Sequence, residues 1–436
     1  MPAILAAYLA LQANNLRHRA YVAQDHQFHF ANTLRLLDHP GRWFDEDFTN
    51  RPLLYWVGGL CLRLAGDRGA FWLPAAVFVL LSAAALWLLH DSSRRMVRSP
   101  ALRIGLLAGV AFLPATVATC AAYAADTAAM LPFALLGWSL LRSVEAADER
   151  EGRAALRIAA AALLLGLFAK FTFLALPLAI RLAAWLLVRR GRLSAARARG
   201  LTAACVVLPL LVGAALQLMN RLQTHGNHLT SFIWSGTGEL TARELLLPRA
   251  ADRQLLAAPV YWQPAAGGGY ALLQPHRFSY PGLFHLGLFS DVLDLGPHGL
   301  DPALGSRPEP QRTLAAWSVA AGLPVSGLTV AALAAFALSL ARGGRGLDPG
   351  LLLWGLLGAA WYGALILPLP FVRGAYLYGY WLPRLVLPAV WCFALLAVGL
   401  LDWAARRHPW LAWVGGVYLL AEAALHACSL WYGPAA

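Results

Sequence analysis

The sequence predicts an all-α protein that crosses a membrane many times. Of its 436 residues, 59% are hydrophobic and only 13% are charged, which is too apolar for one soluble core and too long for a single span. Apolar stretches of about 20 residues, the length that crosses a hydrocarbon layer as a helix, recur along the whole chain. Together these observations predict a polytopic membrane protein.

About eleven transmembrane helices follow from the lengths of these stretches. They are expected near residues 1–16, 69–90, 104–122, 126–142, 156–169, 171–188, 201–219, 314–341, 349–368, 385–404 and 410–430. No internal repeat is visible, which argues against a transporter built from inverted repeats.

Arginine predicts how the chain is oriented. The formal net charge is +13, and because Lys170 is the one lysine, nearly all of the excess is arginine. Arginine-bearing short loops are expected on one side at residues 91–103, 142–157, 189–199, 342–348 and 405–409. By the positive-inside rule these loops are cytoplasmic, so the charge reports topology rather than nucleic-acid binding.

The same topology divides the chain into three parts. Residues 1–219 form an N-terminal transmembrane module, whose first extracytoplasmic loop, 17–68, is expected to carry the catalytic site. Residues 220–313 are expected to form an ordered extracytoplasmic loop or subdomain, and residues 314–436 the C-terminal transmembrane helices. Juxtamembrane amphipathic helices are expected beside the spans.

The segment after the first span, YVAQDHQFHFANTLRLLDHP, predicts an amphipathic helix outside the membrane core. In a helix from about Asp25, the side chains of Asp25, His29 and Asn32 share one face, because residues three and four apart are neighbours. The opposite face is apolar and can lie in the membrane interface. A simpler interpretation makes Asp25 an N-cap and His29 a solvated neighbour.

Further along the same loop, DEDFTNRPLLYW places Arg51 at the outer interface. Pro52 forces Arg51 into extended geometry and can begin a new helix that carries Tyr55. The preceding acids, residues 45–47, could bind a divalent cation, although a run of acids in a loop is more often simply solvated.

Two ionisable residues are expected at the outer ends of apolar helices. Asp126 lies between the third and fourth predicted spans, and Lys170 between the fifth and sixth. Burying an unpaired charge at membrane depth costs roughly a few kcal/mol, so such residues are usually functional or paired. A compact ammonium suits a phosphate group, and the alternative is a lysine that snorkels to the interface.

The segment RGAYLYGYWLPRLVLPAVW opens the tenth span from the outer side. Arg384 is expected where the lipid headgroups begin, which is well placed for bidentate contact with a phosphate. The nearby aromatic side chains, Tyr380 among them, are also explained by an interfacial aromatic belt. In the last span, Glu422 and His426 are four residues apart and are expected to satisfy each other, with a proton relay as the alternative.

Five of these pieces resemble motifs of one family. The chain is similar to the GT-C superfamily of membrane glycosyltransferases, in particular the protein O-mannosyltransferase and aminoarabinose-transferase-like bacterial families. The matching segments, in order, are DHQFHF with Asp25 and His29, NRPLLYW with Arg51, AADTAAM with Asp126, LFAKFT with Lys170, and RLVLPA from Arg384. The chain departs from the family pattern where His26 stands in place of a common acidic residue and Arg51 in place of His.

The resemblance implies transfer of a sugar from a polyprenyl-phosphate carrier to a lipid, polysaccharide or protein acceptor, with inversion at the anomeric carbon. In that scheme Asp25 is the base, His29 orients it, and Asp126 positions the acceptor or shares the base role. Lys170, Arg384 and Arg51 would bind the donor phosphate, and Tyr55 and Tyr380 the substrate. No metal ligand is assigned, although a divalent cation could take part.

The implied location is the extracytoplasmic face of a bacterial inner membrane, since the arginine bias is typical of a GC-rich genome. Two other classes of function remain open at this point. One is a polytopic transporter or lipid flippase without transferase chemistry, and the other is an inactive protein of the same fold.

Overall fold

The computed structural model describes most of the chain. The described residues are 1–17, 26–41, 43, 52–69, 72–223, 249–253, 262–264, 270–272, 279–289, 309–344, 346–366 and 383–431. Within these ranges, the side chains at 26–28, 67–69, 262–264, 270–272, 309–312, 366, 383 and 384 are not described.

The architecture is almost entirely helical. In the first half of the chain the helices are α1 (Pro2–Arg17), α2 (His26–Asp38), α3 (Leu53–Gly69), α4 (Trp72–Met96), α5 (Pro100–Ala111), α6 (Pro114–Ala121), α7 (Ala125–Glu145), α8 (Glu149–Ala169), the 3-10 helix η1 (Phe171–Ala175), α9 (Leu176–Arg189), α10 (Ala195–Thr202), the π-helical η2 (Ala203–Val207) and α11 (Leu208–Gln223). The second half contributes α14 (Tyr280–Phe289), α16 (Glu309–Ala341), α17 (Pro349–Ile366), α18 (Pro383–Ala405) and α19 (Trp410–Leu430). The predicted all-α class is confirmed.

Helices occupy all eleven stretches predicted as spans. Among the described residues, eight helices are long and apolar enough to cross a membrane, or nine if the bent pair α5 and α6 is one span. The remaining two stretches, α1 and α17, are shorter. The structure therefore supports an integral membrane protein, and eleven crossings stays a prediction.

The helix ends follow from local sequence. Pro100 and Pro114 each stand at the first helical position, where a missing N–H costs nothing, and the residue before a proline avoids helical geometry. The chain therefore breaks between α5 and α6, which are bent by 51°. Ser99 caps α5 by accepting a hydrogen bond from the Leu102 N–H.

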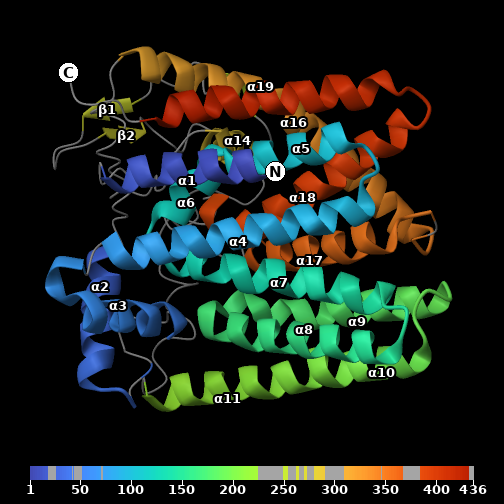
Figure 1. Cartoon of the computed structure of the whole chain (residues 1–436), viewed down its shortest axis with the longest axis horizontal. Helices are drawn as coiled ribbons and strands as arrows, with labels where there is room; N and C mark the ends of the chain where they lie inside the picture. The colour runs from blue at the N-terminus through green and yellow to red at the C-terminus, as the bar shows by residue number, and fades with distance from the viewer. Residues whose placement is uncertain are drawn as a thin grey trace.

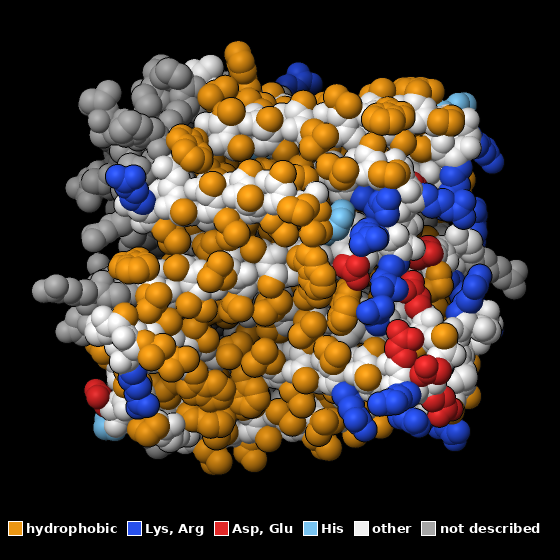
Figure 2. Space-filling model, viewed as in Figure 1, with side chains coloured by type: hydrophobic (Ala, Val, Ile, Leu, Met, Phe, Trp, Pro, Cys, Tyr) orange, Lys and Arg blue, Asp and Glu red, His pale blue; other side chains and the backbone are white. Residues whose placement is uncertain are grey.

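The long helices lie side by side, with the connections of one end all on the right in Figure 1. That end holds the α4–α5, α7–α8, α9–α10, α16–α17 and α18–α19 connections. Figure 2 shows most of the Lys, Arg, Asp and Glu side chains of this face gathered there, while hydrophobic side chains cover most of its middle. The predicted arginine-bearing loops thus share one end of the bundle.

The opposite end carries α2 and α3, which pack against each other outside the row of long helices (Figure 1). A two-stranded antiparallel sheet, β1 (Trp262–Pro264) with β2 (Tyr270–Leu272), lies at this end as well. These strands belong to the segment 220–313. They are the β-strands found among the described residues.

The bundle core is centred on α7, which packs against α4, α8, α17 and α18. Gly137 lets the Trp354 ring approach, because a Cβ at Gly137 would lie 2.6 Å from that ring. Phe133, Phe173 and Trp361 meet edge to face with ring centroids 5.1 to 6.4 Å apart. Trp361 of this aromatic core also lies close to Lys170.

Candidate functional site

Asp126 and Lys170, predicted from separate motifs, form a buried ion pair. The chain turns sharply between α6 and α7, so Asp126 falls in the first turn of α7, where the helix dipole favours a negative charge. Lys170 stands between α8 and η1, and its N–H completes α8 by bonding to the Gly166 carbonyl at 2.8 Å. The two side chains are 10% and 9% exposed.

Lys170 also reaches the beginning of α18. Its ammonium donates a hydrogen bond to the Leu385 carbonyl at 3.3 Å, and the Trp361 indole N–H donates to the same carbonyl at 3.0 Å. The Lys170 nitrogen lies 5.9 Å from the centroid of the Trp361 ring, within reach of a cation–π attraction. Lys170 therefore contacts the backbone one residue from Arg384.

A second polar cluster joins α2 and α3 to the turn between α6 and α7. His29 Nδ1 lies 3.3 Å from the Tyr55 hydroxyl. Thr33 donates a hydrogen bond to the His29 carbonyl at 2.8 Å, and its Oγ1 lies 2.7 Å from the Tyr123 hydroxyl. The Tyr123 hydroxyl also reaches the Leu54 carbonyl at 3.1 Å. His29, Thr33, Tyr55 and Tyr123 are each at most 3% exposed.

The two clusters are connected through the turn that carries Tyr123 and Asp126. The hydroxyl of Thr127 lies 2.6 Å from the Thr119 carbonyl and 3.1 Å from the Ala122 carbonyl, so it closes the turn from the α7 side. Tyr123 points to α2 and α3 while Asp126, three residues later, points to Lys170. A short, hydrogen-bonded segment therefore joins the contacts of α2 to the Asp126 ion pair.

The polar face predicted for α2 is turned into the protein. His29 is 3% exposed and Asn32 5%, whereas Leu34, on the other face, is 41% exposed. Burial of polar groups is tolerated only where they are hydrogen-bonded. The interpretation of His29 as a solvated neighbour is therefore wrong.

An aromatic cluster lies beside Lys170. Trp43, Trp56 and Phe168 are in mutual contact, with ring centroids 5.4 to 6.1 Å apart. Phe168 is two residues before Lys170 on α8, so the contact fixes the beginning of α3 next to the end of α8. Tyr55, predicted to bind substrate, is 2% exposed, and its hydroxyl faces His29.

Several predicted site residues lie outside the described residues. These are Asp25, Arg51, Tyr380 and the acids at 45–47, and the side chain of Arg384 is not described either. Among the residues that are described, no group of three or more His, Cys, Asp and Glu could hold a metal ion.

Sequence reasoning missed Thr33, Tyr123 and Gly58. Gly58 on α3 faces the Tyr123 hydroxyl, and none of the three belongs to a motif of charged residues. Thr33 follows His29 by four residues, so the helical repeat placed it on the polar face. Its partner Tyr123 is 90 residues away, and no pattern in the neighbouring sequence predicted the contact.

Comparison with solved structures places three chains beside this one. The ArnT protein of Cupriavidus metallidurans in the apo state is 14% identical with a TM-score of 0.43, over 92% of this chain and 76% of that chain. The same protein bound to undecaprenyl phosphate is 15% identical with a TM-score of 0.43, over 93% and 77%. The oligosaccharyltransferase of Archaeoglobus fulgidus in the apo form is 12% identical with a TM-score of 0.49, over 99% of this chain and 56% of that chain.

Both of these proteins are GT-C membrane glycosyltransferases. The similarity is weak, and membership of this chain in that superfamily stays a prediction from its sequence motifs. No protein-family model matches the sequence, and no curated protein matches it.

Proposed function

We propose that the protein is a membrane glycosyltransferase that moves a sugar from a polyprenyl-phosphate-linked donor to an acceptor at the extracytoplasmic face. The observation that carries the proposal is the buried contact between Lys170 and Asp126 beside the beginning of α18. It brings three of the five motif segments to one place, at the end of the bundle opposite the arginine-bearing loops.

Lys170 is suited to bind the phosphate that leaves the sugar. An ammonium has three protons, and in the described contacts two of them are directed to Asp126 and to the Leu385 carbonyl. The third is available to a phosphate oxygen. Negative charge grows on that oxygen as the C–O bond breaks, and a cation in a poorly hydrated site stabilises it strongly. Arg384 and Arg51 are proposed as further phosphate ligands.

Asp126 gives Lys170 a counter-charge before substrate binds. A lone ammonium at this depth would be costly to bury, and the carboxylate offsets that cost. When a phosphate contacts Lys170, Asp126 is close to the reacting centre and can position the acceptor or share the role of base.

The acceptor hydroxyl must lose its proton as the sugar bond forms. We assign this proton to Asp25, with inversion at the anomeric carbon, and assign His29 to orient Asp25. A free Asp has a pKa of about 4 and is a weak base, so proximity and the departing phosphate must supply most of the acceleration. Tyr55, hydrogen-bonded to His29, and Tyr380 complete the proposed substrate contacts.

The proposed setting is a bacterial inner membrane with the site on its periplasmic side. The acceptor is a lipid, a polysaccharide or a protein, and nucleic acid has no place in the reaction. A divalent cation could bind the acids at 45–47, and no step is assigned to it.

The proposal is tested with the full-length protein in liposomes that contain a polyprenyl-phosphate sugar and a cell-envelope acceptor fraction. Sugar transfer is expected for the unaltered protein and not for Asp25→Asn. Both proteins are expected to fold and to insert into the membrane to the same extent. Near-normal turnover of Asp25→Asn would remove Asp25 from the base role. Movement of the lipid-linked sugar across the bilayer without transfer would establish the rival function, a transporter or flippase.

A further inference from the structure

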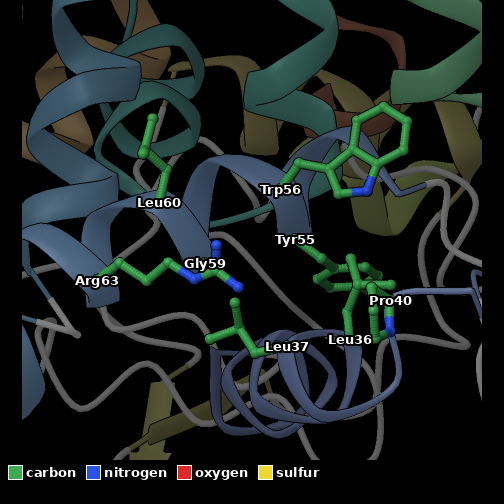
Figure 3. Close-up of a pocket in the computed structure, with 8 residues that line it drawn as sticks. All are labelled: Leu36, Leu37, Pro40, Tyr55, Trp56, Gly59, Leu60 and Arg63. Carbon is green, nitrogen blue, oxygen red and sulfur yellow. The ribbon is translucent and has the colours of Figure 1, made fainter.

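A groove of about 210 Å³ runs between α2 and α3, and Tyr55 of the candidate site lines part of it. Its walls are mainly apolar, with Leu36 and Leu37 from α2 and Trp56 and Leu60 from α3 (Figure 3). Leu60 is 59% exposed, so one side of the groove is open at the protein surface.

Arg63 supplies the charged group of this groove. In Figure 3 its guanidinium extends from α3 toward the space above Leu37. Among the residues that the structure describes, no carboxylate forms an ion pair with Arg63 and no group accepts a hydrogen bond from it. An uncompensated guanidinium over an apolar channel is complementary to a molecule with one anionic group and a long apolar chain.

Arg63 is a positive charge distinct from Lys170, and among the described residues no contact joins the two. Trp56 packs on Phe168, close to Lys170 in the chain. Arg63 follows Trp56 by seven residues on α3, which is about 10 Å along a helix axis. Arg63 therefore lies about two helical turns beyond the α3 residue that packs on Phe168.

We infer that this groove binds an anionic phospholipid of the surrounding bilayer. The phosphodiester lies on Arg63, and an acyl chain lies along Leu36, Leu37 and Leu60. α2 and α3 lie together at the end of the bundle, outside the row of long helices (Figure 1). A phospholipid at the membrane interface has an anionic phosphodiester and an apolar acyl chain next to each other, as this groove requires. This inference goes beyond the proposed sugar transfer and does not depend on it.

The bound lipid would join the two helices that hold His29 and Tyr55. Its chain contacts α2 through Leu36 and Leu37, and its headgroup contacts α3 through Arg63. Occupancy would therefore stabilise the packing of α2 on α3, on which the His29–Tyr55 contact depends.

Native mass spectrometry of the full-length protein in detergent tests the inference, with dioleoyl phosphatidylglycerol and dioleoyl phosphatidylcholine as probes. We expect tighter binding of phosphatidylglycerol and about a tenfold loss of that binding in Arg63→Gln, because a charged hydrogen bond is removed. Arg17→Gln is the matched control, since Arg17 is also an exposed arginine, at the end of α1, outside the groove. Its lipid binding should not change.

A second variant fills the groove without touching the charge. Leu60→Trp alters an exposed side chain, so the fold is expected to survive, and retention of both lipids at this site should fall. Equal binding by Arg63→Gln and the unaltered protein would overturn the inference. So would stronger competition by polyprenyl phosphate than by phosphatidylglycerol at the Arg63-dependent site, because the groove would then belong to the donor. Neither readout uses sugar transfer, so a failed proposal about the reaction leaves this test intact.

Discussion

A Cβ atom on Gly58 would lie 2.0 Å from the hydroxyl oxygen of Tyr123 and 3.0 Å from Thr33 Oγ1. α3 therefore approaches the turn between α6 and α7 so closely that a side chain does not fit between them. Because Tyr123 precedes Asp126 by three residues, this contact places α3 close to the turn that carries Asp126.

Gly58→Ala is expected to separate α3 from this turn. Forcing a methyl group into a close-packed contact typically costs about 1–3 kcal/mol, so the apparent melting temperature of the purified protein should fall. Gly327→Ala is the matched control, because a Cβ at Gly327, also in a helix, meets nothing within 4 Å. That variant should unfold at the same temperature as the unaltered protein or slightly higher.

Tyr123→Phe should partly rescue Gly58→Ala. It removes the oxygen nearest to the new methyl group, although the ring carbon Cζ, 2.9 Å from the same point, remains. The two changes should thus be non-additive in thermal stability. Purely additive losses would show that the hydroxyl is not what excludes a side chain at Gly58.

Lys170→Met is expected to abolish sugar transfer and to destabilise the protein. The change keeps a long unbranched side chain but leaves Asp126 as a buried carboxylate without its cation, which costs about 3–5 kcal/mol for a buried pair. Binding of the lipid-linked donor, measured by competition with a labelled polyprenyl phosphate, should fall as well.

The double variant Lys170→Met with Asp126→Asn separates stability from function. It removes both charges, so the melting temperature should recover toward that of the unaltered protein. Donor binding should not recover, since the cation is still missing. Full donor affinity in this double variant would contradict the assignment of Lys170 to the phosphate.

The meeting of Asp126 and Lys170 was predictable only in part. Each residue could be recognised in the sequence as an ionisable group at the end of an apolar span. Counting the spans predicted both residues on the same side of the membrane. The long helices follow from length and hydropathy, which are local properties, and helices occupy all eleven predicted stretches, whereas α14 lies in the segment 220–313, where no helix was predicted. Which side chains touch depends on packing between segments 44 residues apart, and periodicity does not report it.

The same reason explains what the sequence did not reveal. The contact between Thr33 and Tyr123 joins residues 90 positions apart, and Gly58 acts by lacking a side chain. The break before Pro114 did carry a local signal, since a proline disfavours helical geometry in the residue before it. The apolar run was nevertheless predicted as one uninterrupted span because hydropathy does not change at the break.

Tyr55→Phe tests whether the contact with His29 serves the reaction. Loss of one hydroxyl removes a 3.3 Å contact worth about 1 kcal/mol, so stability should change little. If His29 orients the base, kcat should fall several-fold with little change in the donor KM. Tyr362→Phe is the control, because its hydroxyl donates to Tyr280 at 3.1 Å in another part of the bundle. An equal effect of both variants on kcat would assign Tyr55 a structural role.

The last prediction concerns Glu422 and His426, which lie four residues apart in α19 with 3.5 Å between Glu422 Oε1 and His426 Nε2. His426 Nδ1 also bonds to Ser318 on α16, and all three side chains are at most 5% exposed. The two residues are thus in ion-pair contact, although Glu422 Oε1 accepts no hydrogen bond among the described residues, and His426 is bonded to a neighbouring helix. A buried polar group that keeps its partners holds two helices together, whereas one that loses them is expensive.

His426→Leu should therefore lower the melting temperature markedly, because it strands a carboxylate inside the bundle, while Glu422→Gln keeps a hydrogen-bonding group of the same size and should be close to neutral. Sugar transfer per folded molecule should be unchanged in Glu422→Gln. A proton relay in a transporter requires a group that exchanges its proton, and glutamine has none to exchange. Loss of substrate movement in a well-folded Glu422→Gln protein would therefore favour the transporter over the transferase.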